Sequence, residues 1–383
     1  MPTCARWPLT SAARGSAVSD PTVSATGQDD AAEAAGVLDE IGARIRAARG
    51  AGESLHLLGG GTKAFLCGEP RAPRLSLAVY RGIIAYQPSE LVIEVRAGTP
   101  LAEVESLLAQ HGQMLAFEPP RFGPSSTIGG VVSAGLSGPA RPYAGAVRDH
   151  VLGVGLLDMS GAVLRFGGRV MKNVAGYDIS RLVTGAWGTL GPIAEVAVRV
   201  APRPERVLAM AWAVDATRAL SRMNELAGQS WPLAGACFDG LHLRVRLAGT
   251  GPAVAAAVDA LRPDSVDEEL EFWEALRDFR LPFFADERPL WRLAVPPATA
   301  PLALPGDSLI DWGGAQRWLK TEAGAAEIHS VASRAGGYAQ PFFAADAAQH
   351  APLSPAQRML QARIRTSLGG ADLFNPGCAR VGS

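Results

Sequence analysis

Five consecutive residues early in the chain have the composition of an anion-binding turn. They are Gly59, Gly60, Gly61, Thr62 and Lys63, and they directly follow the apolar run at 54–58. Glycines at the end of a strand present several backbone N–H donors at one point, and the lysine adds a cation. This combination suits a pyrophosphate group. Because the spacing matches neither the Walker A pattern nor G-x-G-x-x-G, the turn alone is equally compatible with a plain tight turn.

A longer segment rich in small residues spans 119–150. It contains Thr127-Ile128-Gly129-Gly130 and ends in Arg148-Asp149-His150. Ordering glycine and serine is entropically costly, so folded proteins keep them where the backbone must pass close to something. We find no helical or alternating apolar period in this segment. It therefore predicts a loop whose amides face an anion or a planar polar ring, rather than an ordinary surface loop.

Apolar patterns on either side predict the elements that position these two segments. A helix with one apolar stripe at 37–45 precedes the first turn, and a second helix begins at Pro100 with Thr99 as its N-cap. The sequence Asp158-Met159-Ser160-Gly161 predicts a hairpin. Strands are predicted at 54–58, 91–95, 151–157, 162–166 and 196–200.

Two prolines, Pro202 and Pro204, mark a boundary before the second half of the chain. A strand at 241–247 and helices at 253–261 and 270–279 predict a smaller α+β domain there. His242 is predicted on the solvated face of that strand, and Trp312 and Trp318 are predicted core residues.

Composition excludes several functional classes. The 383 residues are enough for two domains with their own cores, and a net charge of -1 with 19% charged residues does not indicate a nucleic-acid surface. No run approaches the roughly 18 apolar residues that a membrane span needs. The four cysteines, Cys4, Cys67, Cys237 and Cys378, form no CxxC pair. Their spacing argues against a zinc site, an iron–sulfur site and a disulfide framework, and it suits a reducing cytoplasm.

Five motifs in order resemble the FAD-binding domain of the vanillyl-alcohol-oxidase type, also called the PCMH type. They lie at 59–63, 127–130, 148–150, 172–178 and 188–191. Each is weak alone, but five in this order with plausible gaps are specific. In the second half, 281–284 (Leu-Pro-Phe-Phe), 310–320 and 373–377 (Leu-Phe-Asn-Pro-Gly) resemble the FAD-binding subunits of bacterial glycolate oxidase, also called glycolate dehydrogenase. The resemblance covers about residues 35–380.

This resemblance implies an α+β fold, with a PCMH-type FAD-binding domain of two α+β subdomains and an α+β cap domain. The FAD-binding domain is expected at 35–202 and the cap at 203–349. Residues 350–383 would form a C-terminal helix and a Phe-Asn-Pro-Gly segment that returns to the FAD domain. Residues 1–34 are rich in Ala, Ser, Thr and Pro and predict a disordered tail, and no apolar segment follows the early arginines as a secretory signal would require.

The same resemblance implies where FAD would bind. The pyrophosphate would lie on 59–63 and the flavin along 127–130, with the adenine near the main chain of Ile193. Some relatives attach the flavin through a histidine after the glycine turn; Thr62-Lys63 stands there, so we expect non-covalent FAD. Lys172, Tyr177 and Asn375 are candidates for the edge of the flavin, with a surface cation, a packed ring and a turn residue as their structural alternatives. The predicted cofactor-binding residues are Gly59, Gly60, Gly61, Thr62, Lys63, Pro119, Thr127, Ile128, Gly129, Gly130, Ser133, Gly138, Arg148, Lys172, Ile193 and Asn375.

No catalytic base and no metal ligand can be nominated from the sequence. Larger flavoproteins of this superfamily that oxidise 2-hydroxy acids carry a His-x-Gly-Asp-Gly-Asn-x-His type segment, whereas here Gly306-Asp307 is followed by Ser308-Leu309. A base must reach the substrate hydroxyl within hydrogen-bond distance. The chain also departs from the common Ser-Glu-Gly-Thr-Leu-Gly pattern, because Ala186-Trp187 precedes Gly188.

Three functions agree with these observations. In the first, the chain is an FAD-binding subunit of a glycolate dehydrogenase and passes electrons from a second flavoprotein subunit to an iron–sulfur subunit and a membrane carrier. In the second, it is a stand-alone FAD oxidoreductase of a small alcohol or hydroxy acid. In the third, it is an assembly subunit with structural FAD. The missing segment favours the first and third. The absence of cysteine clusters places any iron–sulfur centre in another chain. The expected location is cytoplasmic, or peripheral on the inner face of the membrane through its partners.

Overall fold

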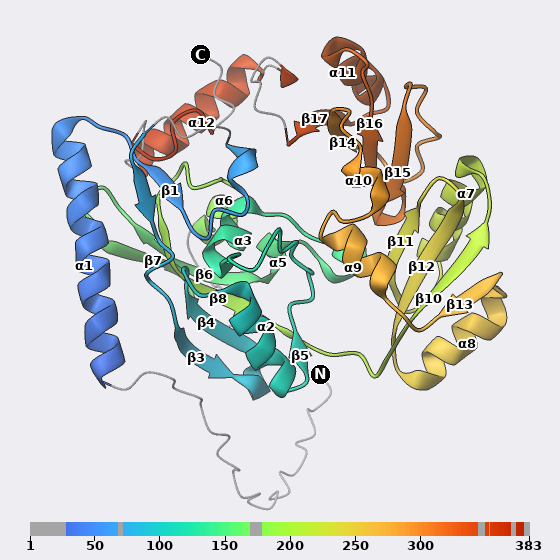
Figure 1. Ribbon diagram of the computed structural model, residues 1–383, viewed down its shortest axis with the longest axis horizontal. Coiled ribbons are helices and arrows are strands. Elements are labelled where there is room, and N and C mark those ends of the chain that lie inside the picture. Colours follow the sequence, from blue (N-terminus) through green and yellow to red (C-terminus); the bar gives the residue numbers. More distant parts are fainter. Residues whose placement is uncertain are drawn as a thin grey trace, which may run out of the picture.

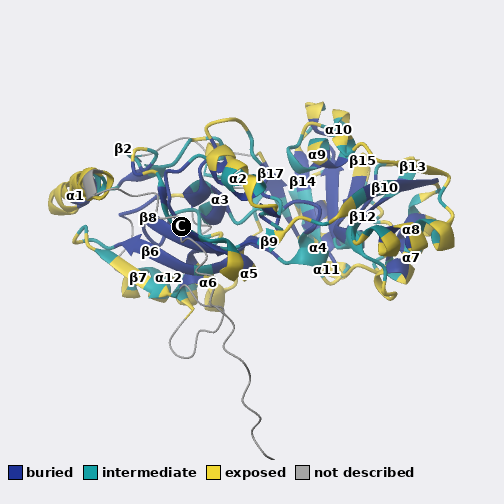
Figure 2. Ribbon diagram, turned by 90° about the horizontal axis from the view of Figure 1, so that it is seen from below, coloured by how far each residue is buried: buried dark blue, intermediate teal, exposed yellow. Residues whose placement is uncertain are grey.

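The computed structural model describes residues 28–67, 72–168, 178–343, 349–351, 353–368 and 373–378. The chain forms two lobes, one around a five-stranded sheet and one around an eight-stranded sheet (Figure 1). Smaller two-stranded sheets, β1-β2 and β5-β9, complete the first lobe. Figure 2 shows that buried residues concentrate in the sheets of both lobes, while the outer helices carry exposed faces.

The first lobe contains most of the elements up to residue 202. Its helices are α1 (Gln28–Ala51), η1 (Ala64–Leu66), η2 (Pro88–Glu90), α2 (Leu101–Gln110), α3 (Ile128–Ala134), α4 (Arg141–Ala144), α5 (Val147–His150) and α6 (Ile179–Val183). Its strands are β1 (His56–Leu58), β2 (Arg74–Ser76), β3 (Ile83–Gln87), β4 (Val92–Arg96), β5 (Gln113–Met114), β6 (Val151–Leu157), β7 (Val163–Gly167), β8 (Ile193–Arg199) and β9 (Ala201–Pro202).

Strand β8 is the centre of the five-stranded sheet, whose order is β3-β4-β8-β6-β7. Both faces of β8 are covered, so the strand is buried along nearly its whole length. Val196 and Val198 face the core formed with α2 and α3, and Ala194 faces the core formed with α1. The charge of Glu195 on this second face is paired, because Glu195 accepts hydrogen bonds from Arg165 and from the hydroxyl of Tyr80. Central strands buried on both faces need this kind of pairing for any charge they carry.

The second lobe begins at β10 and is built on the sheet order β13-β10-β12-β11-β15-β16-β14-β17. Helices α7 and α8 pack through Leu220, Met223 and Val254 against one half of this sheet. Its elements are β10 (Arg206–Ala213), α7 (Ala216–Ala227), β11 (Leu233–Phe238), β12 (His242–Gly249), α8 (Gly251–Leu261), β13 (Ser265–Asp267), α9 (Glu271–Arg277), α10 (Pro282–Ala285), β14 (Leu290–Ala294), β15 (Asp307–Asp311), η3 (Trp312–Gly314), β16 (Gln316–Lys320), α11 (Ala325–Arg334) and β17 (Tyr338–Phe342).

The C-terminal part of the chain returns to the first lobe. Ile364 of helix α12 (Pro355–Ser367) and Leu368, the C-cap residue of this helix, pack against the core of the five-stranded sheet. Leu373 and Phe374 are buried beside α1, and Phe374 forms a parallel bridge with Leu55. The described helices include none that is both long and apolar enough to cross a membrane.

Polar and aromatic contacts join the lobes. Trp312 of η3 donates from Nε1 to the carbonyl of Gly138 at 3.0 Å, and Arg246 of β12 donates to Glu118 at 2.7 Å. A further contact is aromatic: the ring of Phe122 stacks on Phe279 with centroids 5.0 Å apart. Trp312 and Trp318 are 6% and 3% exposed, which confirms the prediction that both belong to the core. His242 is partly exposed on β12, as predicted.

The structure corrects three local predictions. Helix α1 starts at Gln28, so the predicted disordered tail does not extend through 28–34; the alanines at 31–35 are strong helix formers, and residues 1–27 lie outside the described part. The segment 119–150 is not a continuous loop, because it contains α3, α4 and α5. Pro100, not Thr99, occupies the N-cap of α2, and the Thr99 hydroxyl instead donates to the carbonyl of Arg96.

The cysteines also differ from expectation. Cys67 and Cys378 form a disulfide although 311 positions separate them, so the argument against disulfides was wrong for this pair. Chain topology brings the end of η1 and the C-terminal segment together, and spacing along the sequence could not show this. Cys237 is a free, buried thiol.

Candidate functional site

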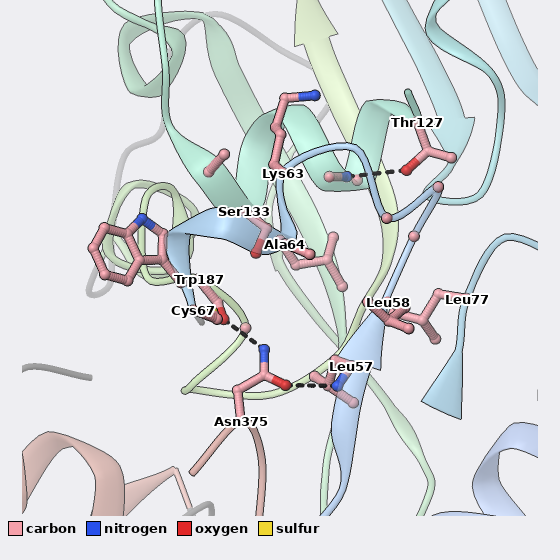
Figure 3. Close-up of a pocket in the computed structure, with 18 of the residues that line it drawn as sticks. Leu57, Leu58, Lys63, Ala64, Cys67, Leu77, Thr127, Ser133, Trp187 and Asn375 are labelled. Carbon is pink, nitrogen blue, oxygen red and sulfur yellow. Dashed lines mark hydrogen bonds between the residues drawn. The ribbon is translucent and has the colours of Figure 1, made fainter. Parts of the chain in front are cut away.

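A pocket in the first lobe collects most of the residues that the sequence singled out. Its walls are the end of β1 with the turn at 59–63, helix α3, the turn at 187–193 and the C-terminal segment at Asn375 (Figure 3). The predicted residues that line it are Gly59, Gly60, Gly61, Thr62, Lys63, Thr127, Gly129, Gly130, Ser133, Ile193 and Asn375.

Other predicted residues lie elsewhere. Ile128 is fully buried in the hydrophobic core, and Gly138 lies at the contact between the lobes. Pro119 is buried outside the pocket lining, and Arg148 is exposed on α5. Lys172 and Tyr177 fall outside the described residues, so the structure gives no position for them.

The turn at 59–63 is shaped by close contact with the loop at 125–127. A Cβ on Gly60 would lie 1.5 Å from the carbonyl oxygen of Ser125, and a Cβ on Gly59 would lie 2.4 Å from Thr127 Oγ1. Gly61 has φ +73 and open space around it. In the described part of the chain, the backbone N–H groups of 60–63 have no protein acceptor. Unpaired amides at the end of a strand can bind phosphate oxygens.

Lys63 adds a cation to this turn. Its Nζ donates to Ser126 Oγ at 2.7 Å, and no carboxylate of the described residues lies within 4.0 Å of it. Burial lowers the pKa of Lys63 from 10.5 to about 8, and the charge of Asp278 opposes the shift. An ammonium that is desolvated without a carboxylate partner gains stability from a bound anion.

Helix α3 contributes surface to the pocket rather than hydrogen-bond donors. The amides of Ile128 and Gly129 donate to the carbonyls of Thr99 and Ala97, and the amide of Gly130 donates to the capping hydroxyl of Thr127. These amides are therefore already paired, contrary to the expectation that they face an anion. A Cβ on Gly129 would lie 2.5 Å from Ala97 Cβ, so glycine allows α3 to approach the end of β4.

Asn375 fixes the opposite wall. Its Oδ1 accepts from the amide of Leu57 at 2.5 Å, and its Nδ2 donates to the carbonyl of Trp187 at 2.7 Å (Figure 3). One side chain thus connects the end of β1 with the turn at 187–193. Both Asn375 and Trp187 have positive φ, at 46 and 53.

Several lining residues were missed by sequence reasoning. Trp187 could have been found, because it directly precedes the Gly-Thr-Leu-Gly turn. Leu57, Leu77 and Ala97 also line the pocket, but they are ordinary apolar strand or loop residues that carry no chemical signal. Cys67 also lines the pocket, but its sequence position was considered only together with those of the other three cysteines.

The pocket offers binding groups but no evident proton acceptor. None of its described lining residues is aspartate or glutamate. His56 lines it from β1 but is 3% exposed, and burial together with the nearby Arg74 lowers its pKa. Within the described residues, no group of three or more His, Cys, Asp or Glu side chains could hold a metal ion. The arrangement suits a ligand with phosphates and apolar rings.

Comparison with known proteins identifies that ligand. Residues 32–167 match the family model of the FAD binding domain. The chain is 43% identical over 323 residues to the glycolate oxidase subunit GlcE of Escherichia coli strain K12, covering 84% of this chain and 91% of that protein. The chain belongs to the GlcE family. It is an FAD-binding oxidoreductase, which confirms the predicted family, cofactor and enzyme class.

More distant relatives agree with the GlcE assignment. The glycolate oxidase subunit GlcD of Bacillus subtilis strain 168 is 41% identical over 80 residues, which cover 21% of this chain and 17% of that protein. A solved structure of alkyldihydroxyacetonephosphate synthase matches with a TM-score of 0.62 at 14% identity, over 88% of this chain and 75% of that one. This likeness shows the fold and confirms the predicted α+β, PCMH-type architecture. The unpaired amides of 60–63, the desolvated Lys63 and the apolar walls fit FAD.

Proposed function

We propose that this chain is the FAD-binding subunit of a multi-subunit glycolate (2-hydroxy acid) dehydrogenase that oxidises glycolate to glyoxylate and passes the electrons to a membrane carrier. Its partners would be a second flavoprotein subunit, where glycolate is oxidised, and an iron–sulfur subunit. The observation that carries this proposal is the similarity to GlcE over nearly the full length of both chains, combined with a pocket whose described lining residues include no carboxylate.

The residues of this chain would act by holding and orienting FAD. The pyrophosphate would accept hydrogen bonds from the amides of 60–63 and would be neutralised by Lys63. The adenine would lie against Leu57 and Leu77 near the main chain of Ile193, and the flavin would lie along Gly129, Gly130 and Ser133. Bound FAD supplies the capacity to accept and release two electrons. The protein supplies a fixed position for it and excludes water from its apolar walls.

A missing base separates this subunit from a stand-alone enzyme. Removal of hydride from a 2-hydroxy acid needs a group that takes the hydroxyl proton, and a well-placed base typically contributes about 10²–10⁴-fold in rate. Because the described pocket lining contains no Asp or Glu and its histidine is buried in a strand, we infer that the isolated chain reacts very slowly with glycolate.

Stopped-flow reduction of the flavin tests this proposal. The purified subunit is mixed with excess glycolate or D-lactate, alone and co-purified with partner subunits. We expect negligible reduction alone and rapid reduction in the complex. Reduction of the isolated subunit at turnover-competent rates would establish a stand-alone oxidoreductase. A flavin in this subunit that is never reduced in an active complex would establish an assembly role.

We also propose that FAD is held without a covalent bond, since Thr62-Lys63 follows the glycines and no histidine or cysteine lies within the turn. Acid precipitation should release the flavin into the supernatant as FAD. Flavin that remains in the washed protein pellet would contradict this.

A further inference from the structure

The disulfide between Cys67 and Cys378 joins two walls of the FAD pocket. Cys67 directly follows η1, which continues the turn at 59–63, and it lines the pocket. Cys378 ends the described C-terminal segment, 311 positions away, and the two Cα atoms are 4.5 Å apart. This Cα separation lies within the range found for disulfides.

The disulfide completes a ring of chain around the pocket. From β1 the backbone runs through the turn and η1 to Cys67, crosses the disulfide to Cys378, and returns to Asn375. The Oδ1 of Asn375 accepts from the amide of Leu57 in β1, which closes the ring. Among the described residues, the other links between the C-terminal segment and the pocket are non-covalent: the backbone bonds of Leu373 and Asn375 with Leu55, and the side-chain bonds of Asn375.

A reductant in solution has a route to this bond that does not pass through the FAD pocket. Cys378 lines a second cavity of about 370 Å³ between the turn at 185–190, β17 and α12. Trp187 separates the two cavities, since it lines both. Cys67 is half-buried, in contrast to Cys237, which is fully buried in the second lobe. Cys378 is 4% exposed, so Cys67 is the more accessible residue of the pair. Because Cys67 lines the cofactor pocket, the state of the bond affects the wall of that pocket.

We propose that Cys67 and Cys378 form a redox-reversible latch on the FAD pocket. A dithiol reductant supplies two electrons and two protons, its own sulfurs form a disulfide, and the Cys67–Cys378 bond is replaced by two thiols. The C-terminal wall is then held only by its hydrogen bonds and by the packing of Leu373 and Phe374, and FAD leaves faster. A disulfide oxidant reverses the exchange and closes the latch. Disulfides with this behaviour are reactive and regulatory rather than purely structural.

FAD release measures the state of the latch. Holoprotein is treated with oxidised glutathione or with dithiothreitol, desalted without oxygen, and diluted, and the rise in FAD fluorescence gives the release rate. Alkylation and mass measurement count free thiols in each sample. We expect release to be about tenfold faster after reduction, an effect similar in size to the loss of about one hydrogen bond. Cys67→Ser and Cys378→Ser should release FAD at the reduced rate with or without dithiothreitol, while Cys237→Ala should behave like wild type.

Two results would overturn the latch. One is equal release from oxidised and reduced wild type when the thiol count confirms that the bond has opened. The other is two free thiols at Cys67 and Cys378 after treatment with oxidised glutathione. If a serine variant fails to fold, the chemical reduction of wild type decides. The inference rests on FAD binding and not on glycolate oxidation, so a chain inert toward glycolate can still show redox-dependent FAD release.

Discussion

Asn375 donates from Nδ2 to the carbonyl of Trp187 across 188 positions of sequence, at a distance of 2.7 Å. The Oδ1 of the same side chain accepts from the backbone amide of Leu57, so a side chain at this position must supply both a donor and an acceptor. The primary amide of asparagine supplies both from two separate atoms. This fits asparagine at a position with positive φ, where asparagine is also better tolerated than most residues.

Replacing Asn375 should weaken FAD binding. Asn375→Ala removes both bonds and leaves the Leu57 amide and the Trp187 carbonyl unpaired, so we expect a loss of about tenfold in FAD affinity. Asn375→Asp keeps the acceptor but removes the donor, and it should also weaken binding by placing a negative charge in the pocket. Fluorescence titration of apoprotein with FAD measures both. Asn224→Ala is the matched control, because Asn224 bonds a helix carbonyl in the second lobe; equal losses in all three variants would show that the effect is global.

Gly60 should tolerate no side chain. In Gly60→Ala the new Cβ would lie 1.5 Å from the Ser125 carbonyl, so the turn must move away from the loop at 125–127 and FAD content should fall sharply. Gly36→Ala in exposed helix α1 is the control, since nothing lies within 4 Å of its Cβ. This control should be neutral or slightly stabilising, by up to about 1 kcal/mol. Absorbance at flavin wavelengths per mole of protein gives the comparison, and normal flavin content in Gly60→Ala would refute the role of this turn.

The lowered pKa of Lys63 predicts that FAD affinity depends on pH. Its pKa is lowered to about 8, so the ammonium that would neutralise the pyrophosphate is present below pH 8 and is lost as pH rises through that value. FAD affinity should therefore decrease above pH 8, and Lys63→Gln should bind more weakly with a flat profile in this window. Lys63→Arg should keep its affinity to higher pH, because arginine stays charged.

The stability of the apoprotein should change with pH in the opposite direction to the FAD affinity. Between pH 8 and 10.5 the unfolded state binds the Lys63 proton and the folded state does not, so the contribution of Lys63 to the free energy of unfolding rises with pH across this window. Urea unfolding of apoprotein at several pH values, compared with Lys63→Gln, isolates that contribution. A parallel pH dependence in both proteins would mean that other groups are responsible.

The ion pair between Arg246 and Glu118 should couple the two lobes. Their side chains are 9% and 14% exposed, so Arg246→Met leaves a nearly buried carboxylate unpaired and should cost about 3 kcal/mol of unfolding free energy. Glu118→Gln keeps the acceptor for the amide of Ala140 and removes the charge, so adding it to Arg246→Met should restore part of the loss. Urea unfolding of the two single variants and the double variant tests this coupling. Additive losses would show that the two charges act independently.

Local motifs predicted pocket-lining residues where those residues are adjacent in the sequence, while their roles in binding FAD stay predictions. The turn at 59–63 and the segment containing Thr127 to Gly130 were selected from their own residues, and Ile193 from the family resemblance. The structure brings most of them together in one pocket. Helix α3 was missed because its seven residues include two glycines and are too short to show an apolar period. The disulfide and the contact between Asn375 and Trp187 were missed because the tertiary fold alone brings their partners together.

The parallel bridge between Phe374 and Leu55 also sets an order of events during synthesis. Residues 373–378 are translated after both sheets, yet they supply one wall of the cavity that opens at β1. A nascent chain can pack its lobes while these residues are still inside the ribosome, but it cannot yet close the cavity. We therefore expect loading of FAD into a finished pocket to be a late step in the maturation of this protein, after the ribosome has released the segment around Asn375.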